Sequence, residues 1–255
     1  MTKSFHAGKA ASDGLLSALL AKNGLTSPPN ILEGEKGLGS LLSSDFSPQR
    51  GLEGLGESYT IMGLSFKPYA SCLYTHPAID ATIQLRKEHQ LKPEAVKTIQ
   101  CSVSKFCVDA ACHKDPKTGL DAKFSTPYCI AIALLEGRAG EDLFQDERIG
   151  DPVIRELMKK VQIEEKGELS DREAEVRIKL CSGKTVEYRV HYPLGCPENS
   201  LSNHELEKKA RNLLDPIFCQ QRVDVILEKL WALESLKSIT ELTSLLSEEH
   251  PKHDV

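Results

Sequence analysis

The sequence predicts an α+β fold, in which helical segments at the two ends of the chain flank a middle region of helices and strands. Helical patterns occupy residues 4–22 and return from Ser202 onward, and β-favouring runs occur only in between. At 255 residues the chain can bury the core of one large or two modest domains. We therefore expect a helical domain built from residues 1–65 and 196–255, with an α+β domain at 66–195 inserted into it.

The first expected element is a helix over residues 4–22. Small residues fill its first half, leucines follow at positions 15, 16, 19 and 20, and Gly24 is a natural C-cap. A helix of this composition packs closely against its neighbours. The glycine-rich passage that follows contains neither a G-x-G-x-x-G nor a P-loop pattern, so it does not indicate phosphate binding.

The segment FKPYASCLYTHPAIDA at 66–81 gathers five polar or reactive side chains within ten residues: Lys67, Tyr69, Cys72, Tyr74 and His76. Pro68 restricts the backbone of Lys67 to extended or turn conformations, which restrains its ammonium group. A helix start surrounded by lysine, tyrosine and histidine suits a bound anion, and thus a substrate pocket. In the alternative interpretation these rings only pack beneath a loop, because titratable clusters do not always mark sites.

A helix is expected to begin at His76 and Pro77. Thr75 can cap this helix, and proline is favoured in a first helical turn. Ile79, Ile83 and Leu85 can face a core, which leaves the charged side chains, among them Asp80 and Arg86, in water.

Strands are expected in the middle of the chain. The β-favouring residues of 95–110 predict one strand. Residues 175–180 and 185–192 flank Cys181-Ser182-Gly183-Lys184, which predicts a hairpin with Val176 and Ile178 on the same side as Val186 and Tyr188.

The other helices are indicated by their start signals. Ser125, Thr126 and Pro127 introduce an apolar helix within 124–135, and Asp151 with Pro152 begins an amphipathic helix that runs to Val161. The expected C-terminal helices are 204–214, with Asn203 as the cap, 223–236 and 239–246.

Composition excludes several classes of function. Hydrophobic residues make up 40% of the chain and charged residues 27%, with a net charge of -5, as in an ordinary soluble globular protein. There is no basic surplus that would indicate nucleic acid as a partner. No apolar run approaches the roughly 18 to 20 residues that cross a bilayer, so we expect no membrane partner.

The eight cysteines include no C-x-x-C pair. Neither a zinc ribbon nor a usual iron–sulfur run is therefore indicated, and we expect no metal and no cofactor. Reduced, mostly buried thiols are the expected state.

Several motifs in order support a family resemblance. They are KSFHAGKAASDGLLSALLAKNGL at 3–25, ILEGEKGLGS at 31–40, FKPYASCLYTHPAIDA at 66–81, FSTPYCIAIALLEG at 124–137 and PLGCPENSLSNHELEKKAR at 193–211. With these motifs the chain resembles the MmgE/PrpD family, which includes 2-methylcitrate dehydratase and cis-aconitate decarboxylase. The resemblance implies a two-domain lyase, usually a homodimer, with a helical domain made from both chain ends and an inserted α+β lid.

In such proteins the pocket lies between the helical domain and the lid, and it binds a di- or tricarboxylate without a metal. By resemblance, Lys3 and His6 match the K-x-x-H-x-G motif, Lys67 matches the pocket lysine at the start of the lid, and Tyr128 matches the tyrosine of F-S-x-P-Y. Lys3, Lys67 and Tyr128 are the expected catalytic residues. The expected substrate-binding residues are His6, Tyr69, Cys72 and His76.

These residue types fit lyase chemistry, since paired ammonium groups stabilise the negative charge that builds up when a proton or CO2 leaves. Lys3 and Lys67 would hold substrate carboxylates, Tyr128 would donate a hydrogen bond or a proton, and a histidine would act as acid or base. Structural alternatives remain open: Lys3 as a frayed terminal charge, Tyr128 as a core tyrosine bonded to backbone, Cys72 as a packed thiol, and either histidine as a satisfied structural residue.

Three functions follow from the resemblance. The first is dehydration of 2-methylcitrate or another 2-alkylcitrate, and the alternative is decarboxylation of a cis-aconitate-like acid. A third is a truncated, non-catalytic homologue that binds a full-length partner. Leu73 stands where many relatives carry arginine, which bears on substrate selectivity.

Full-length relatives carry a long helical segment before the point that matches the start of this chain. We therefore expect the helix at 4–22 to expose an apolar patch, and a homodimer or a homologous subunit to cover it. The cytoplasm is the expected compartment, with the mitochondrial matrix as the alternative on family grounds.

Overall fold

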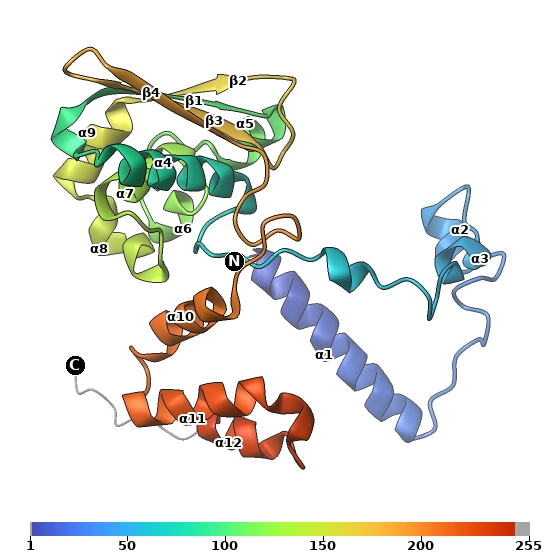
Figure 1. Ribbon diagram of the computed structural model, residues 1–255. Helices are drawn as coiled ribbons and strands as arrows, with labels where there is room; N and C mark the ends of the chain where they lie inside the picture. Colours follow the sequence, from blue (N-terminus) through green and yellow to red (C-terminus); the bar gives the residue numbers. More distant parts are fainter. Residues whose placement is uncertain (1, 248–255) are drawn as a thin grey trace. The chain divides into compact units, whose positions relative to one another are not determined.

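The structure, a computed structural model, describes residues 2–247, apart from the side chains of Lys3 and Ser4. It divides into two compact units, Met1–Thr60 and Ile61–Val255 (Figure 1). The expected domain boundaries at residues 65 and 195 stay predictions. The assignment of residues 196–255 to the same domain as the N-terminal segment stays a prediction.

The N-terminal unit contains helices α1 (Thr2–Lys22), α2 (Leu38–Leu42) and α3 (Pro48–Leu52). Helix α1 confirms the helix expected over 4–22, and Gly24 ends it in the left-handed conformation at φ +92°. There the N–H of Leu25 donates to Leu20 O and the N–H of Gly24 donates to Ala21 O, both at 3.0 Å. This is a Schellman motif, which satisfies the last carbonyls of the helix.

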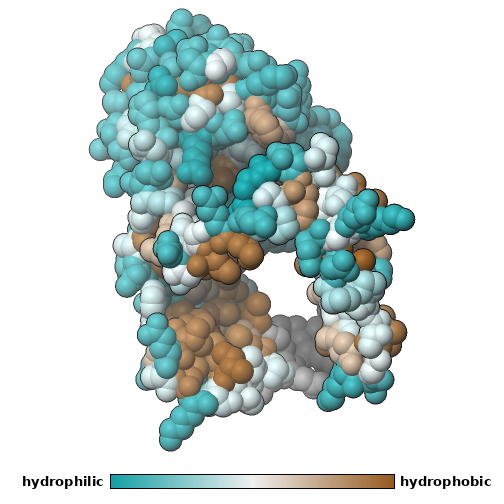
Figure 2. Space-filling view, turned by 90° about the vertical axis from the view of Figure 1, so that its right-hand side faces the viewer, coloured by the Kyte–Doolittle hydropathy of each residue, from teal (hydrophilic) through white to brown (hydrophobic). Residues whose placement is uncertain are grey.

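The apolar patch expected on this helix is present, since these large apolar side chains of α1 are exposed: Phe5, Leu15, Leu16, Leu19 and Leu20. Figure 2 shows that the region that holds the sheet, in the upper part of the view, has a mostly hydrophilic surface. Large apolar side chains exposed together on one helix are typical of a face that another polypeptide covers.

The second unit is built on a four-stranded mixed sheet with the order β2-β1-β3-β4. Its strands are β1 (Val96–Val103), β2 (Val161–Glu165), β3 (Ala174–Leu180) and β4 (Thr185–Val190). Strand β1 runs parallel to β2 and antiparallel to β3, which pairs antiparallel with β4. The expected hairpin is confirmed, with Val176 opposite Tyr188 and Ile178 opposite Val186.

One face of this sheet carries the core. Along β3, Ala174, Val176 and Ile178 are buried, while the side chains between them point away from the core. Helices α4 (His76–His89) and α7 (Thr126–Glu136) pack under this face, as Figure 1 shows, and α9 (Pro152–Lys159) packs against α7. The sheet and these helices, with the segments that join them, span residues 66–195, and we call this region the lid.

The remaining α-helices are short or lie after the lid. They are α5 (Lys105–Ala111), α6 (Gly119–Ala122), α8 (Asp146–Ile149), α10 (Asn203–Leu214), α11 (Gln220–Trp231) and α12 (Thr240–Ser247). The last three confirm the expected C-terminal helices to within a few residues. Arg222 Nε donates to Leu245 O at 2.8 Å and so joins α11 to α12.

Two sequence predictions were wrong in this region. The strand expected over 95–110 ends at Val103, because Ser104 accepts a hydrogen bond from the N–H of Cys107 and begins α5. Strand β2 was not expected, because the helix that starts at Pro152 was thought to run to Val161, where β2 begins.

Two helix caps also differ from expectation. Thr75 occupies the N-cap position of α4 without a side-chain cap bond, because its hydroxyl donates to Cys72 O at 2.8 Å instead. The first turn does contain a proline, as expected. At α10 the N-cap is Ser202 rather than Asn203, and Glu205 completes a capping box with it.

No helix among residues 2–247 is long and apolar enough to span a bilayer.

Candidate active site

The two ends of the lid meet beside the polar cluster. The N–H of Phe66 donates to Gly195 O at 2.8 Å, and the N–H of Leu194 donates to Asp80 Oδ2 at 2.7 Å. Gly195 has φ +93°, and a Cβ at this position would lie 2.0 Å from Phe66 O. A side chain there would push the two segments apart, so glycine is required where the chain enters and leaves the lid.

Lys67 lies at this entrance with an exposed side chain. Its Nζ donates to Ser71 O at 3.0 Å, which folds the side chain back over its own loop. An ammonium group has three N–H donors, and this bond uses one of them. The Lys67 side chain is thus held at the start of the lid and faces solvent, and its role as a pocket lysine stays a prediction.

His76 begins α4 and is fully buried. Its Nε2 lies 3.4 Å from Ser71 O, and the Tyr69 ring stands edge-on to the imidazole at 5.2 Å between centroids. Within residues 2–247, Nδ1 has no hydrogen-bond partner. Burial, assisted by the nearby Lys67 ammonium, lowers the pKa of His76 to about 4, so the ring is neutral at pH 7.

Tyr69 and Asp80 form a second polar pair. The tyrosine hydroxyl donates to Asp80 Oδ1 at 2.5 Å, and the other carboxylate oxygen accepts the N–H of Leu194. Burial raises the pKa of Asp80, and the hydrogen bonds from Tyr69 and Leu194 partly offset this rise. Burial and the Asp80 carboxylate together raise the pKa of Tyr69 above its ordinary value. The pair ties the loop and the exit segment to α4.

The sequence interpretation missed this role of Asp80. We expected Asp80 to face water with the other charged residues of the helix, but it is half-buried. Arg86 was also expected in water, and its guanidinium instead donates from Nε to Leu134 O at 2.8 Å. Both residues bond partners that are distant in sequence, so no local pattern could have identified these contacts.

An open groove lies beside the pair, between α4 and the end of β4. Its volume is about 500 Å³, and its lining includes Tyr69, Asp80, Gln84, Tyr188, Arg189 and His191. This volume falls within the range of small-molecule pockets. Lys67 and His76 are not among the lining residues, so the groove adjoins the polar cluster and shares only Tyr69 with the predicted site residues.

Cys72 is half-buried and packs against the lid core. Its backbone N–H donates to Lys123 O at 2.8 Å, which fixes the loop to the segment before α7. These contacts fit the structural alternative of a packed thiol. Binding of substrate by Cys72 stays a prediction.

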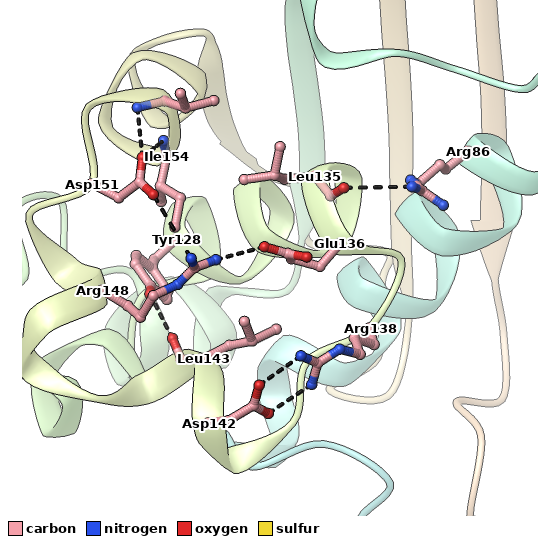
Figure 3. A network of polar contacts seen from close by, with 11 residues as sticks. Arg86, Tyr128, Leu135, Glu136, Arg138, Asp142, Leu143, Arg148, Asp151 and Ile154 are labelled. Carbon is pink, nitrogen blue, oxygen red and sulfur yellow. Dashed lines mark hydrogen bonds and ion pairs between the residues drawn. The ribbon is translucent and has the colours of Figure 1, made fainter.

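Tyr128 lies in α7 with no exposed surface. Its hydroxyl donates to Leu143 O at 2.6 Å, and the ion pair between Arg148 and Glu136 lies near its ring (Figure 3). Burial raises the pKa of Tyr128 to about 12, so the hydroxyl stays protonated at pH 7. The Tyr128 hydroxyl is thus bonded to a backbone carbonyl in the lid core, as in the structural alternative. Its catalytic role stays a prediction.

Lys3 and His6 belong to α1 of the N-terminal unit, whereas the other predicted site residues belong to the lid. The His6 side chain is exposed, with its ring 6.4 Å from that of Phe5. The side chain of Lys3 lies outside the described part of the chain. Among the described residues there is no group of three or more histidine, cysteine and acidic side chains that could hold a metal ion.

The fold is thus an α+β unit whose entrance carries an exposed lysine beside a buried histidine and a half-buried tyrosine–aspartate pair. Residues 69–233 match the MmgE/PrpD C-terminal domain, and residues 1–51 match the MmgE/PrpD N-terminal domain. The chain belongs to the MmgE/PrpD family.

Three relatives carry the same printed name. The chain is 27% identical over 257 residues to a cis-aconitate decarboxylase of Mus musculus, and the alignment covers 96% of this chain and 52% of the relative. It is 27% identical over 261 residues to the cis-aconitate decarboxylase of Homo sapiens, and this alignment covers 98% of the chain and 54% of the relative. It is 24% identical over 269 residues to the cis-aconitate decarboxylase of Aspergillus terreus (strain NIH 2624 / FGSC A1156), and this alignment covers 97% of the chain and 55% of the relative. The chain spans about half the length of the curated relatives it matches.

Proposed function

We propose that this chain carries the lid, with part of the helical domain, of a lyase that decarboxylates a cis-aconitate-like tricarboxylic acid. The observation that carries the proposal is the match to cis-aconitate decarboxylases across almost the whole chain. It favours decarboxylation, the alternative from the sequence, over the dehydration of a 2-alkylcitrate that we expected first.

The lid supplies the binding cation for this reaction. Lys67 presents its ammonium group at the lid entrance, where Ser71 O orients it without neutralising it. A carboxylate of the substrate would pair with this cation. When CO2 leaves, the electrons of the broken C–C bond stay on carbon, and a fixed positive charge stabilises the developing anion. A proton added to that carbon completes the reaction.

His76 supports this site without carrying charge. Its low pKa keeps the imidazole neutral at pH 7, so the ring adds no second positive charge beside the Lys67 side chain. Its burial under the Tyr69 ring suits a residue that holds the loop in shape. We propose that His76 positions the loop and that Lys67 contacts the substrate.

A partner completes the proposed site. The apolar face of α1 is exposed, and the relatives are about twice as long as the stretch that this chain matches. We propose that a homologous helical segment, supplied within a longer polypeptide or by another subunit, covers this face and forms the opposite wall of the pocket. Burial of apolar surface would drive this association.

The test supplies the purified chain with the N-terminal half of a cis-aconitate decarboxylase relative. Cis-aconitate and 2-methylcitrate are offered separately, CO2 release is measured, and the products are identified by NMR. We expect CO2 release from cis-aconitate that depends on both polypeptides.

Loss of water from 2-methylcitrate without CO2 release would replace decarboxylation with dehydration. If the two polypeptides bind each other and neither substrate reacts, the lyase proposal is wrong and the chain is a non-catalytic partner.

A further inference from the structure

Two cysteines of the lid meet at the start of α7, away from the polar entrance. Cys107 lies in α5, and Cys112 is the residue that ends this helix. Their sulfurs lie 3.8 and 3.9 Å from the same atom, Thr126 Oγ1. The Thr126 hydroxyl donates to Ala111 O at 2.8 Å, and Cys112 Sγ donates to Cys107 O at 3.5 Å, so the two cysteines are in direct contact.

The two thiols also interact with each other. A hydrogen bond between the Cys107 and Cys112 side chains lowers the pKa of Cys112 and raises that of Cys107, so Cys112 is the member of the pair that ionises. The charge of Lys114 contributes to the same lowering at Cys112.

The backbone adds to this effect. Cys112 forms an isolated β-bridge with Ser125, the N-cap of the 11-residue helix α7. The N-terminal end of a helix favours negative charge, and thiolates at such positions are stabilised. A partner thiol and a lysine thus favour the thiolate at Cys112, whose sulfur lies 3.9 Å from Thr126 Oγ1 at the start of α7.

Access distinguishes the two sulfurs. Cys107 is only 2% exposed, whereas Cys112 is half-buried and so the more exposed of the two residues. A third thiol nearby, Cys101 of β1, is fully buried, and burial raises its pKa far above the ordinary value. Cys112 is therefore placed to react first and Cys107 to react second.

We propose that Cys112 and Cys107 form a peroxide-sensitive dithiol, in which Cys112 is oxidised first and Cys107 resolves it to a disulfide. In the first step the Cys112 thiolate attacks one oxygen of hydrogen peroxide, the O–O bond breaks, and the released hydroxide takes a proton to become water. In the second step Cys107 sulfur attacks the sulfenic sulfur, the S–O bond breaks, and a second water leaves. Two thiols are oxidised and one peroxide is reduced.

The disulfide would change a hydrogen bond near the polar entrance. In the reduced protein Cys107 Sγ donates to Tyr74 O at 3.3 Å, and the Tyr74 ring packs on Phe106 at 5.6 Å between centroids. Tyr74 belongs to the short helical turn Leu73–Thr75 that leads directly into α4 and His76. Oxidation removes the S–H donor, so it releases one of the bonds that hold this turn.

The first test exposes the reduced full chain to limiting hydrogen peroxide and maps every thiol by mass spectrometry. We expect a peptide pair joined through Cys107 and Cys112, lighter by two hydrogen atoms, before any oxidation of the exposed Cys181 and Cys219. Prior oxidation of Cys181 or Cys219, or a disulfide from Cys112 to another cysteine, would overturn the proposal.

Variants assign the order of the two steps. Cys107→Ala should stop at the sulfenic acid of Cys112, trapped by dimedone, and Cys112→Ala should leave Cys107 reduced. Cys219→Ala is the matched control and should form the disulfide as the wild type does. If Cys112→Ala still forms a disulfide between two other cysteines, Cys112 is not the thiol that reacts first.

A second measurement needs no variant and so does not depend on the folding of one. The alkylation rate of each thiol is followed against pH in the same wild-type sample. We expect the alkylation rate at Cys112 to reach half of its maximum near pH 7, because the pKa of this thiol is lowered to about 7. A midpoint at about pH 8.5 or above, the ordinary range of a thiol, would contradict a stabilised thiolate at Cys112.

Discussion

At the scale of single residues, burial decides what each predicted site residue can do. Lys67 keeps its charge in solvent, whereas His76 and Tyr128 lie fully inside the lid and are uncharged at pH 7. The sequence identified the cluster because its members are close along the chain. It did not separate the exposed lysine from the buried rings, because which side chains a loop covers depends on tertiary packing.

The low pKa of His76 predicts a pH-dependent stability. The unfolded chain binds a proton at this residue below its ordinary pKa of 6.5, while the folded protein resists protonation down to about 4. Stability is thus present above pH 6.5 and is lost as the pH falls from there toward 4. Between about pH 7.5 and about pH 5 we expect a loss of about 2 kcal/mol, measured by urea unfolding.

His76→Leu is the comparison for this measurement, because it keeps Asp80, whose raised pKa acts in the opposite direction. The difference between the two profiles of unfolding free energy against pH is the contribution of His76 titration. Identical pH profiles for the wild type and His76→Leu would show that His76 titrates normally.

The pair of Tyr69 and Asp80 gives a second prediction at this scale. Tyr69→Phe removes the hydroxyl and leaves a half-buried carboxylate with the Leu194 N–H as its described partner. We expect the free energy of unfolding to fall by about 1 to 3 kcal/mol. Tyr188→Phe, in the wall of the same groove, is the control and should change it by less than about 0.5 kcal/mol. Equal effects of the two changes would mean that the bond to Asp80 contributes nothing.

At the scale of elements, the strength of the local pattern decided what could be predicted. The hairpin of β3 and β4 was predicted with its facing residues, because apolar and polar side chains alternate along both strands. Strand β2 was missed because it is short and directly follows an amphipathic helix. The end of β1 was missed because a single serine cap, Ser104, begins α5 without a change in composition.

The joint at the base of the lid gives a prediction about elements. Gly195→Ala places a methyl group 2.0 Å from Phe66 O and also strains a backbone at φ +93°. Gly183→Ala strains the similar φ of +90° in the hairpin loop but meets nothing within 4 Å. Thermal unfolding should show that Gly183→Ala costs about 1 kcal/mol and that Gly195→Ala costs at least about 1 kcal/mol more. Equal losses would mean that the contact between the two lid ends does not matter.

At the scale of the whole molecule, the chain has a complete lid core and a helical unit with an exposed apolar face. The motifs gave the family because five of them occur in order, and the order is independent of how any one of them folds. They could not choose between loss of water and loss of CO2, because both reactions use a carboxylate pocket with fixed cations. The choice rests on the relatives.

We propose that Lys67 binds a substrate carboxylate during decarboxylation. The value of kcat/KM for CO2 release from cis-aconitate shows whether it does so. The assay contains the chain together with the N-terminal half of a relative and compares the wild type with Lys67→Ala and Lys87→Ala. Lys87 is the matched control, since it is an exposed lysine on α4. We predict that Lys67→Ala lowers kcat/KM by about 100-fold to 1,000-fold and that Lys87→Ala leaves it within about twofold. A Lys67→Ala protein with the same kcat/KM as the wild type would mean that Lys67 does not bind the substrate.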